Sequence, residues 1–280
     1  MTSEALQGSA TEPLTFSVWK ALATSLGLPF RHPRIAGLCI LPPLLLMTVL
    51  AVLGMTGVLN VVDHSTIALV LVGPVLIALE LSAISFTVYV WSWSVRGMAG
   101  IPREEKRGLR VHAKRFGAFA IRLIPTILLI LATSLLSPFV GTVLATLVRL
   151  PLISLILTLS CRPLLAAIYD DRSIGKTFAG LQMQAIFWRS FALFLALSAL
   201  TAAGVFAHRG FSAYIMQNYY AIAELYEAGI SNEMRIVSIL LVASRLLGAF
   251  LCAVWFTTAA LLPYRHIKFV ETRNAIAAFD

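Results

Sequence analysis

Six long apolar stretches alternate with more polar segments along the chain. They cover about Ala36–Val61, Thr66–Trp91, Ile121–Leu136, Val140–Tyr169, Phe191–Phe206 and Ile236–Tyr264. The hydrocarbon core of a bilayer is about 30 Å thick, so a helix rising about 1.5 Å per residue crosses it in roughly 20 residues. We therefore predict six transmembrane helices. The third and fifth stretches are short, and amphipathic residues before each are available to extend them.

The composition supports a membrane location. Hydrophobic residues make up 59% of the 280 residues and charged residues only 12%, whereas a soluble domain carries about 25% charged residues. In lipid each backbone N–H and C=O needs a partner within the protein, and a helix supplies one internally. The apolar stretches do not alternate in polarity, which argues against barrel strands. The predicted fold class is all-α, a polytopic membrane bundle.

The basic residues gather in alternate loops. Eighteen of the 22 Lys and Arg residues lie before residue 36, within 92–122, within 162–189 or after 264. The opposite loops hold only Arg209 and Arg235. Because cytoplasmic loops are enriched in Lys and Arg, we predict that both termini are cytoplasmic. Residues 1–35 form a cytoplasmic segment with an amphipathic helix and no cleavable signal peptide, residues 36–264 the six-helix domain, and residues 265–280 a basic tail.

The inner loops have the pattern of helices that lie on a membrane surface. Pro102 and the acidic residues after it are typical of a helix start. Four cations share one face of this predicted helix, with aromatic and aliphatic residues roughly opposite. These cations are Arg103, Arg107, Arg110 and Lys114. The pattern predicts binding to anionic lipid headgroups, and Leu14–Phe30 and Ser173–Trp188 are predicted to be similar helices.

The longest outer segment, Arg209–Glu233, is rich in tyrosine. Tyrosine favours the headgroup layer, where its ring is half buried and its hydroxyl is hydrated. We interpret the segment as a separate interfacial helix on the outer face. A docking surface for another protein is the alternative.

Three ionisable residues lie at membrane depth within the apolar stretches: Glu80, Arg149 and Arg245. Charges at that depth are costly, and they commonly pair or face a polar cavity. All three belong to predicted helices that enter from the outer side. The functional interpretation is a polar site for an anionic ligand at the midplane. The structural interpretation is an ion pair that holds three helices in register, with the second arginine extending toward the surface.

Motifs for catalysis and for cofactors are not found. Gly175-Lys176-Thr177 resembles the end of a phosphate loop, but position 170 is Asp170 instead of the required glycine. The five histidines lie at or beyond the ends of the apolar stretches, and the three cysteines have no metal-binding spacing. We therefore predict no enzyme activity, no cofactor and no metal site. Anionic lipid explains the basic loops sufficiently, so we predict no nucleic-acid partner.

One segment carries a family resemblance. The residues Arg162-Pro163-Leu164-Leu165-Ala166-Ala167-Ile168-Tyr169-Asp170-Asp171-Arg172-Ser173-Ile174-Gly175, followed by Phe187-Trp188-Arg189, resemble the YciC-like proteins and the membrane domain of glycerophosphoryl diester phosphodiesterases. In the phosphodiesterases the activity belongs to a separate soluble barrel, for which this chain has no room. The resemblance implies a bacterial inner-membrane protein without an assigned activity.

Together these observations favour a non-enzymatic function. We expect a scaffold or accessory subunit that organises lipid or a membrane-protein complex, with anionic lipids as partners. The alternative is a transporter or channel that uses Arg149, Arg245 and Glu80.

Overall fold

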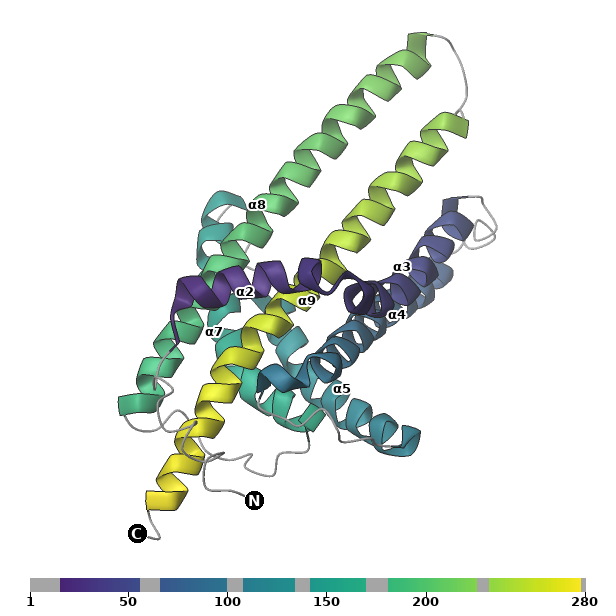
Figure 1. The fold of residues 1–280 in the computed structure, drawn as a ribbon. Helices are drawn as coiled ribbons and strands as arrows, with labels where there is room; N and C mark the ends of the chain where they lie inside the picture. The colour runs from purple at the N-terminus through teal and green to yellow at the C-terminus, as the bar shows by residue number, and fades with distance from the viewer. Residues whose placement is uncertain are drawn as a thin grey trace. The chain divides into compact units, whose positions relative to one another are not determined.

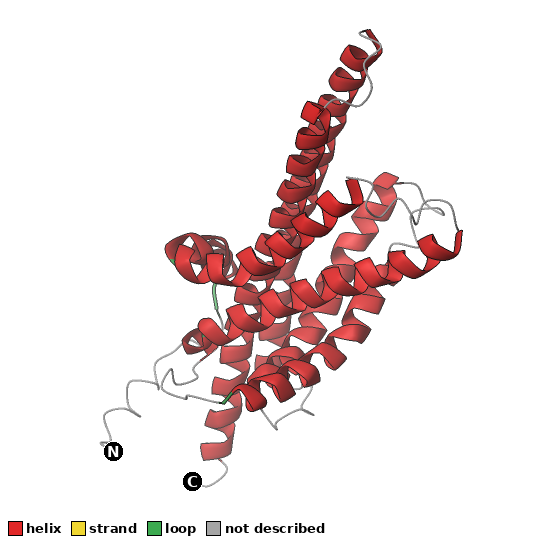
Figure 2. Cartoon of the chain, turned by 90° about the vertical axis from the view of Figure 1, so that its right-hand side faces the viewer, coloured by secondary structure: helices red, strands yellow, loops and turns green. Residues whose placement is uncertain are grey.

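The computed structural model describes residues 16–55, 66–99, 108–133, 142–169, 181–225 and 232–277 (Figures 1 and 2). Within these ranges the chain forms α-helices and one 3-10 turn, and no strand. The elements are α2 (Val18–Arg31), α3 (Pro33–Met55), α4 (Thr66–Ser94), η2 (Arg96–Ala99), α5 (Leu109–Ala132), α7 (Thr142–Tyr169), α8 (Leu181–Leu225) and α9 (Asn232–Ala277).

Five helices are long and apolar enough to cross a membrane. Their candidate spans are Pro33–Leu53, Leu109–Ala132, Leu144–Tyr169, Met183–Asn218 and Ile236–Thr272. The chain is therefore a multi-pass helical membrane protein. Helix α4 covers the remaining apolar stretch, and five candidate spans lie within the described residues, so the count of six stays a prediction.

The side chains are distributed as expected for a protein that faces lipid. Large apolar residues such as Leu45, Ile121 and Leu128 are exposed, whereas Ser154 and Thr158 are completely buried. The hydroxyls of these two residues donate hydrogen bonds to the carbonyl groups of Leu150 and Ser154 in their own helix. Small polar residues let membrane helices approach closely, so the apolar outer surface and polar interior support the same class.

The chain divides into two compact units. The first unit contains residues 1–26, 95–196 and 258–280, and the second contains residues 27–94 and 197–257. The start of α2, all of α5 and α7, the first part of α8 and the last part of α9 belong to the first unit. The second unit contains α3, α4 and the remaining parts of α8 and α9. Each unit is described by itself below.

A proline determines how α3 and α4 are joined in the second unit. Helix α3 contains Pro42 and Pro43 without interruption. Pro43 has no N–H, so the carbonyl group of Cys39, four residues earlier, lacks its helical donor. The Thr87 hydroxyl of α4 donates to that carbonyl across 3.1 Å, and Thr87 is completely buried. The contact satisfies a backbone group that lipid cannot hydrate.

Helices α8 and α9 are longer than a membrane crossing requires. Each has about 45 residues and is therefore roughly 68 Å long. The predicted separate interfacial helix over Arg209–Glu233 is wrong, because residues up to Leu225 continue α8 and residues from Asn232 belong to α9. No proline occurs between Pro163 and Pro263, so no residue in this interval removes a helical donor.

The other amphipathic segments are partly described. Helix α2 confirms the helix predicted near Leu14–Phe30, although it begins later, at Val18. The lead-in residues before the third and fifth stretches are helical and continuous with α5 and α8, so the expected extension is confirmed. The predicted helix start at Pro102 and the first half of Ser173–Trp188 lie outside the described residues, and the second half forms the start of α8.

The contact of Thr87 with α3 gives a stability test. We expect Thr87→Val to lower the free energy of unfolding by about 1–2 kcal/mol, because the Cys39 carbonyl then lacks a donor. Thr87→Ser should keep most of the stability. In a Pro43→Ala background the helical donor is restored, so Thr87→Val should cost less. Denaturation of the purified variants in mild detergent measures these differences, and an equal cost in both backgrounds would contradict the assignment.

Candidate functional site

A cluster of basic side chains ties together three helices of the first unit. It consists of Arg115 and Arg122 on α5, Arg162 on α7, and Lys268 and Glu271 on α9, and we call it the basic cluster. These positions lie where the sequence predicts the cytoplasmic ends of the helices. Arg115 and Arg162 are buried, although both were counted only as charges flanking the membrane.

Arg115 satisfies the end of α7. The carbonyl group of Ile168 lies in the last described turn of α7, which covers Thr142–Tyr169. The Arg115 guanidinium donates to this carbonyl across 3.4 Å, and only 5% of the residue is exposed. A cation at a helix C-terminus is also favoured by the helix dipole. Arg115 therefore acts as a cap for a neighbouring helix.

Two further contacts continue this interface toward the middle of the helices. Arg122 donates to the carbonyl group of Pro163 across 3.2 Å, and Thr126 donates to the Ser160 hydroxyl across 3.0 Å. On α5, Arg115, Phe119, Arg122 and Thr126 are spaced by four, three and four residues, which places them on one helix face. Phe119 is almost completely buried. This spacing is the sequence signal that would have identified the interface.

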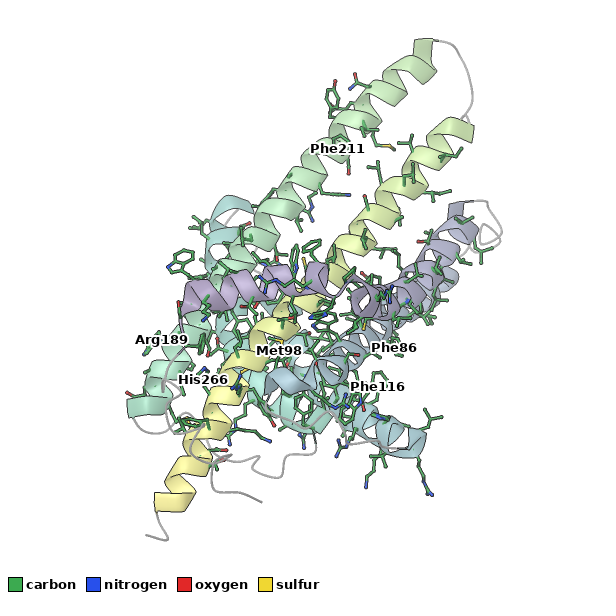
Figure 3. The ribbon with its side chains drawn as sticks, in the orientation of Figure 1. Phe86, Met98, Phe116, Arg189, Phe211 and His266 are labelled. Carbon is green, nitrogen blue, oxygen red and sulfur yellow. The ribbon has the colours of Figure 1, made fainter. Side chains whose placement is uncertain are left out.

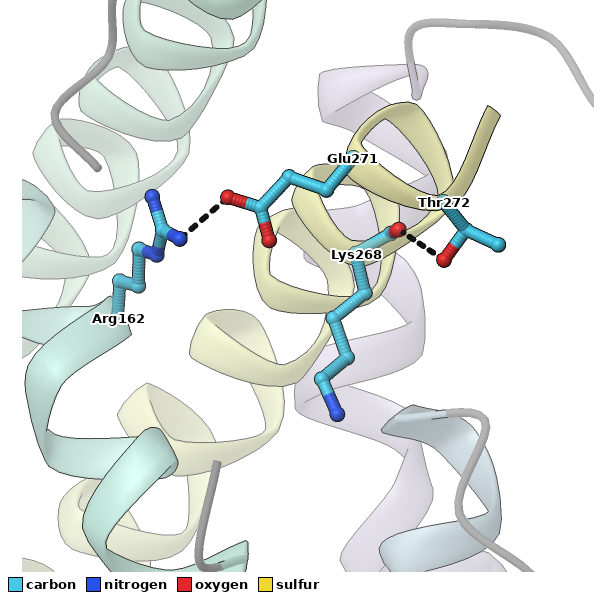
Figure 4. Close-up of polar contacts among 4 residues, drawn as sticks. All are labelled: Arg162, Lys268, Glu271 and Thr272. Carbon is cyan, nitrogen blue, oxygen red and sulfur yellow. Dashed lines mark hydrogen bonds and ion pairs between the residues drawn. The ribbon is translucent and has the colours of Figure 1, made fainter. Parts of the chain in front are cut away.

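An ion pair joins α7 to α9. The Arg162 guanidinium contacts the Glu271 carboxylate (Figure 4), and their side chains are 10% and 17% exposed. Glu271 is the single carboxylate in the described residues of the first unit, where Lys and Arg are many. Among the described residues of this unit, its charge therefore offsets only one of the cations.

Aromatic rings form one side of the basic cluster. Tyr169 and Tyr264 pack in a tilted pair with centroids 5.7 Å apart, and the Lys268 ammonium lies 5.3 Å from the Tyr264 centroid. A cation over an aromatic face gains electrostatic attraction from the ring. Tyr264 is almost completely buried, and Lys268 is partly exposed. The lysine is thus positioned on α9 while part of it stays accessible.

The start of α2 is attached to the same unit. The carbonyl group of Phe16 accepts a hydrogen bond of 2.7 Å from the Arg189 guanidinium of α8. The Phe16 ring stacks on His266 of α9 at 5.6 Å between centroids; Figure 3 marks Arg189 and His266. Ala21, Leu22 and Ser25 form the buried face of α2, whereas Trp19 is 77% exposed. An exposed tryptophan on such a helix is typical of the membrane interface.

The cations predicted to bind lipid are described only in part. Arg110 and Lys114 of α5 are exposed, in agreement with their predicted role at the surface. Arg103 and Arg107 lie outside the described residues. Leu109, predicted on the opposite apolar face, is exposed, whereas Phe119 of that face is buried. Binding of lipid by these cations stays a prediction.

The predicted midplane site also stays a prediction. Glu80 of α4 is partly exposed, and Arg245 of α9 is exposed. No hydrogen bond or ion pair joins these two side chains within the part of the chain that the structure describes. Arg149 of α7 is partly exposed and belongs to the first unit.

Comparison with known proteins found no protein that this chain matches. A scan against protein-family models, a search of curated proteins and a search of solved structures each gave no match.

Neighbouring residues on α5 allow a controlled test of the Arg115 cap. We expect Arg115→Gln to lower the free energy of unfolding by about 1–3 kcal/mol, because the buried carbonyl at the end of α7 loses a charged donor. Lys114→Gln removes the same charge from the exposed adjacent position and should change stability little. Thermal unfolding in mild detergent compares the two, and equal effects would argue against the cap.

The ion pair can be tested by removing one charge and then both. Glu271→Gln leaves Arg162 largely buried without its counter-charge, and we expect a loss of about 1–3 kcal/mol, less than a fully buried pair would show. The double variant Arg162→Met/Glu271→Met should be more stable than Glu271→Gln alone. Unfolding in detergent measures both, and additive losses would contradict the pairing.

Proposed function

We propose that this chain is a non-enzymatic scaffold or accessory subunit of a membrane. It holds anionic lipid headgroups at the basic ends of its helices and organises lipid, or a partner complex, around the bundle. The observation that carries the proposal is that some cations of the first unit contact neighbouring helices, whereas others are exposed. Arg115, Arg122 and Arg162 are occupied with helix contacts, whereas Arg110 and Lys114 are exposed.

The interfacial aromatic residues support this proposal. Trp19 of α2 and Trp188 of α8 are exposed, and both are adjacent in sequence to cations, Lys20 and Arg189. Trp188 also packs edge-on against Phe187 and Phe191 at 5.3 and 6.0 Å between centroids. Tryptophan beside basic residues favours the headgroup layer, where anionic lipid attracts the positive charge.

The proposed location is a bacterial inner membrane, with both termini in the cytoplasm. The asymmetry of Lys and Arg between alternate loops supports this orientation, and the resemblance of residues 162–175 and 187–189 supports a bacterial origin. A reporter protein that functions only in the cytoplasm should therefore be active when it is fused to either end of the chain.

Retention of lipid tests the proposal directly. Native mass spectrometry of the chain, extracted in mild detergent, should find anionic phospholipid bound in preference to zwitterionic lipid. Arg110→Gln/Lys114→Gln should lower the affinity by about ten-fold or more, because each cation near an anionic surface contributes about 1 kcal/mol. Any protein subunit that the scaffold organises should be recovered in fixed stoichiometry in the same extract.

A charge-conserving variant provides the control. Arg110→Lys/Lys114→Arg keeps both positive charges in place and should bind lipid like the unmodified chain. The proposal fails if anionic and zwitterionic lipids are retained equally, or if the two double variants bind anionic lipid equally well.

A further inference from the structure

Helices α8 and α9 each contain one long segment without charge. On α8, residues 190–208 contain no Asp, Glu, Lys or Arg, and the segment is bounded by Arg189 and Arg209. On α9, residues 246–264 form the equivalent segment between Arg245 and Arg265. Each segment is roughly 28 Å long, which matches the hydrocarbon thickness of about 30 Å. Arg209 and Arg245 therefore mark one membrane surface.

Hydrogen bonds fix the register between the two helices within the second unit. The Thr201 hydroxyl contacts the sulfur of Cys252 at 3.7 Å, and His208 Nε2 lies 2.9 Å from the Ser244 hydroxyl. The pairing is antiparallel, because the later residue of α8 pairs with the earlier residue of α9, and Figures 1 and 2 show these parts side by side. Arg209 and Arg245 directly follow the facing residues His208 and Ser244, so they lie at nearly the same height.

The same register places both arginines on one side of the helix pair. Successive residues of a right-handed helix are rotated by about 100°. His208 and Ser244 face each other, and the two helices run in opposite directions. The step to the next residue therefore turns Arg209 and Arg245 toward the same side. Both guanidinium groups therefore lie on the same side of the helix pair, at the end of the apolar segments.

Among the side chains that the structure describes, this pair of cations has no counter-charge in contact with it. Both arginines are exposed, and neither has a hydrogen bond or ion pair with a described residue. The next acidic position after Arg209 on α8 is 224 and the nearest one before Arg245 on α9 is 233, so their backbones lie roughly 18 Å or more farther along the helices. Adjacent like charges at a membrane surface are unfavourable without an anion. The arrangement therefore points to an anionic ligand.

Open space lies beside the seam toward the membrane interior. Gly248 is one turn from Ser244 in that direction, on the side of the arginines, and a Cβ atom added there would meet no atom within 4 Å outside its chain neighbours and its own helix backbone. Phe206, Phe211 and Tyr214 of α8 are exposed, and each lies within five residues of Arg209 (Phe211 is labelled in Figure 3). Aromatic residues at this depth are typical of the interface. An acyl chain could occupy the open space, with its headgroup at the arginines.

We propose that Arg209 and Arg245 together bind the phosphodiester of an anionic phospholipid in the leaflet opposite the basic cluster. The hydrogen bond between His208 and Ser244 holds the two helices in the register that the site needs, and Ser212 contacts the other ring nitrogen of His208 at 3.4 Å. The site goes beyond the proposed inner-face function and requires only that α8 and α9 cross the bilayer. It assigns Arg245 to a membrane surface instead of the midplane.

Photo-crosslinking at an adjacent position tests the site. Phe206→p-benzoylphenylalanine is introduced into the full chain, which is reconstituted in phosphatidylcholine vesicles with a minor fraction of phosphatidylglycerol. Adducts are identified by mass spectrometry, and phosphatidylglycerol should exceed its share of the lipid. Arg209→Gln and Arg245→Gln should each lower this excess about five-fold, and the double variant more than ten-fold. Arg209→Lys/Arg245→Lys should retain most of it.

Each contrary outcome has a defined meaning. Adducts in proportion to lipid composition, or an excess unchanged in the double glutamine variant, would overturn the site. Loss of the adduct when excess inorganic phosphate is added would show that the pair takes a free anion and not a lipid. Arg110→Gln/Lys114→Gln should leave this adduct unchanged, so failure of the inner-face function and failure of this site are separable. Circular dichroism confirms that each variant is folded.

Discussion

In apolar surroundings, a backbone carbonyl group that loses its helical donor has no water to replace it, and some of the contacts between helices of this protein form at such groups. Pro43 removes the donor for Cys39, and the hydroxyl of Thr87 on the next helix supplies another. The carbonyl group of Ile168 lies in the last described turn of α7, and Arg115 supplies a donor from α5. A few polar atoms therefore make helix association specific. The apolar side chains around them can pack against lipid as well as against another helix.

The same requirement separates the basic residues into two groups. Arginines that donate to carbonyl groups or to Glu271 hold helices together, and two of them, Arg115 and Arg162, are buried. Cations such as Arg110 and Arg209, without such an acceptor, remain on the surface where lipid phosphate is available. The group to which a basic residue belongs depends on its position along a helix and not on whether it is Lys or Arg. Adjacent residues Lys114 and Arg115 therefore belong to different groups.

Most of the helical architecture could be predicted from the chain, because apolar length is a strong signal in membrane proteins. The extent of α8 could not, since the tyrosines after Arg209 suggested a separate surface helix, and the absence of proline was the better indicator. The basic cluster was missed because Arg115 and Arg162 were counted by loop and not by helix face. Contacts such as that of Arg162 with Glu271 also depend on which distant helices become neighbours, which spacing within one helix does not reveal.

The attachment of Phe16 has a consequence for biogenesis. The contacts described above come from Arg189 and His266, which follow Phe16 by more than 170 residues. Ribosomes add about 5–20 residues per second. Helix α2 is therefore made roughly tens of seconds before both residues that contact Phe16 have been added. During this interval we expect α2 to lie on the membrane surface, with Trp19 and its apolar face against the lipid. The contacts of Phe16 are therefore completed only after α9 has been made.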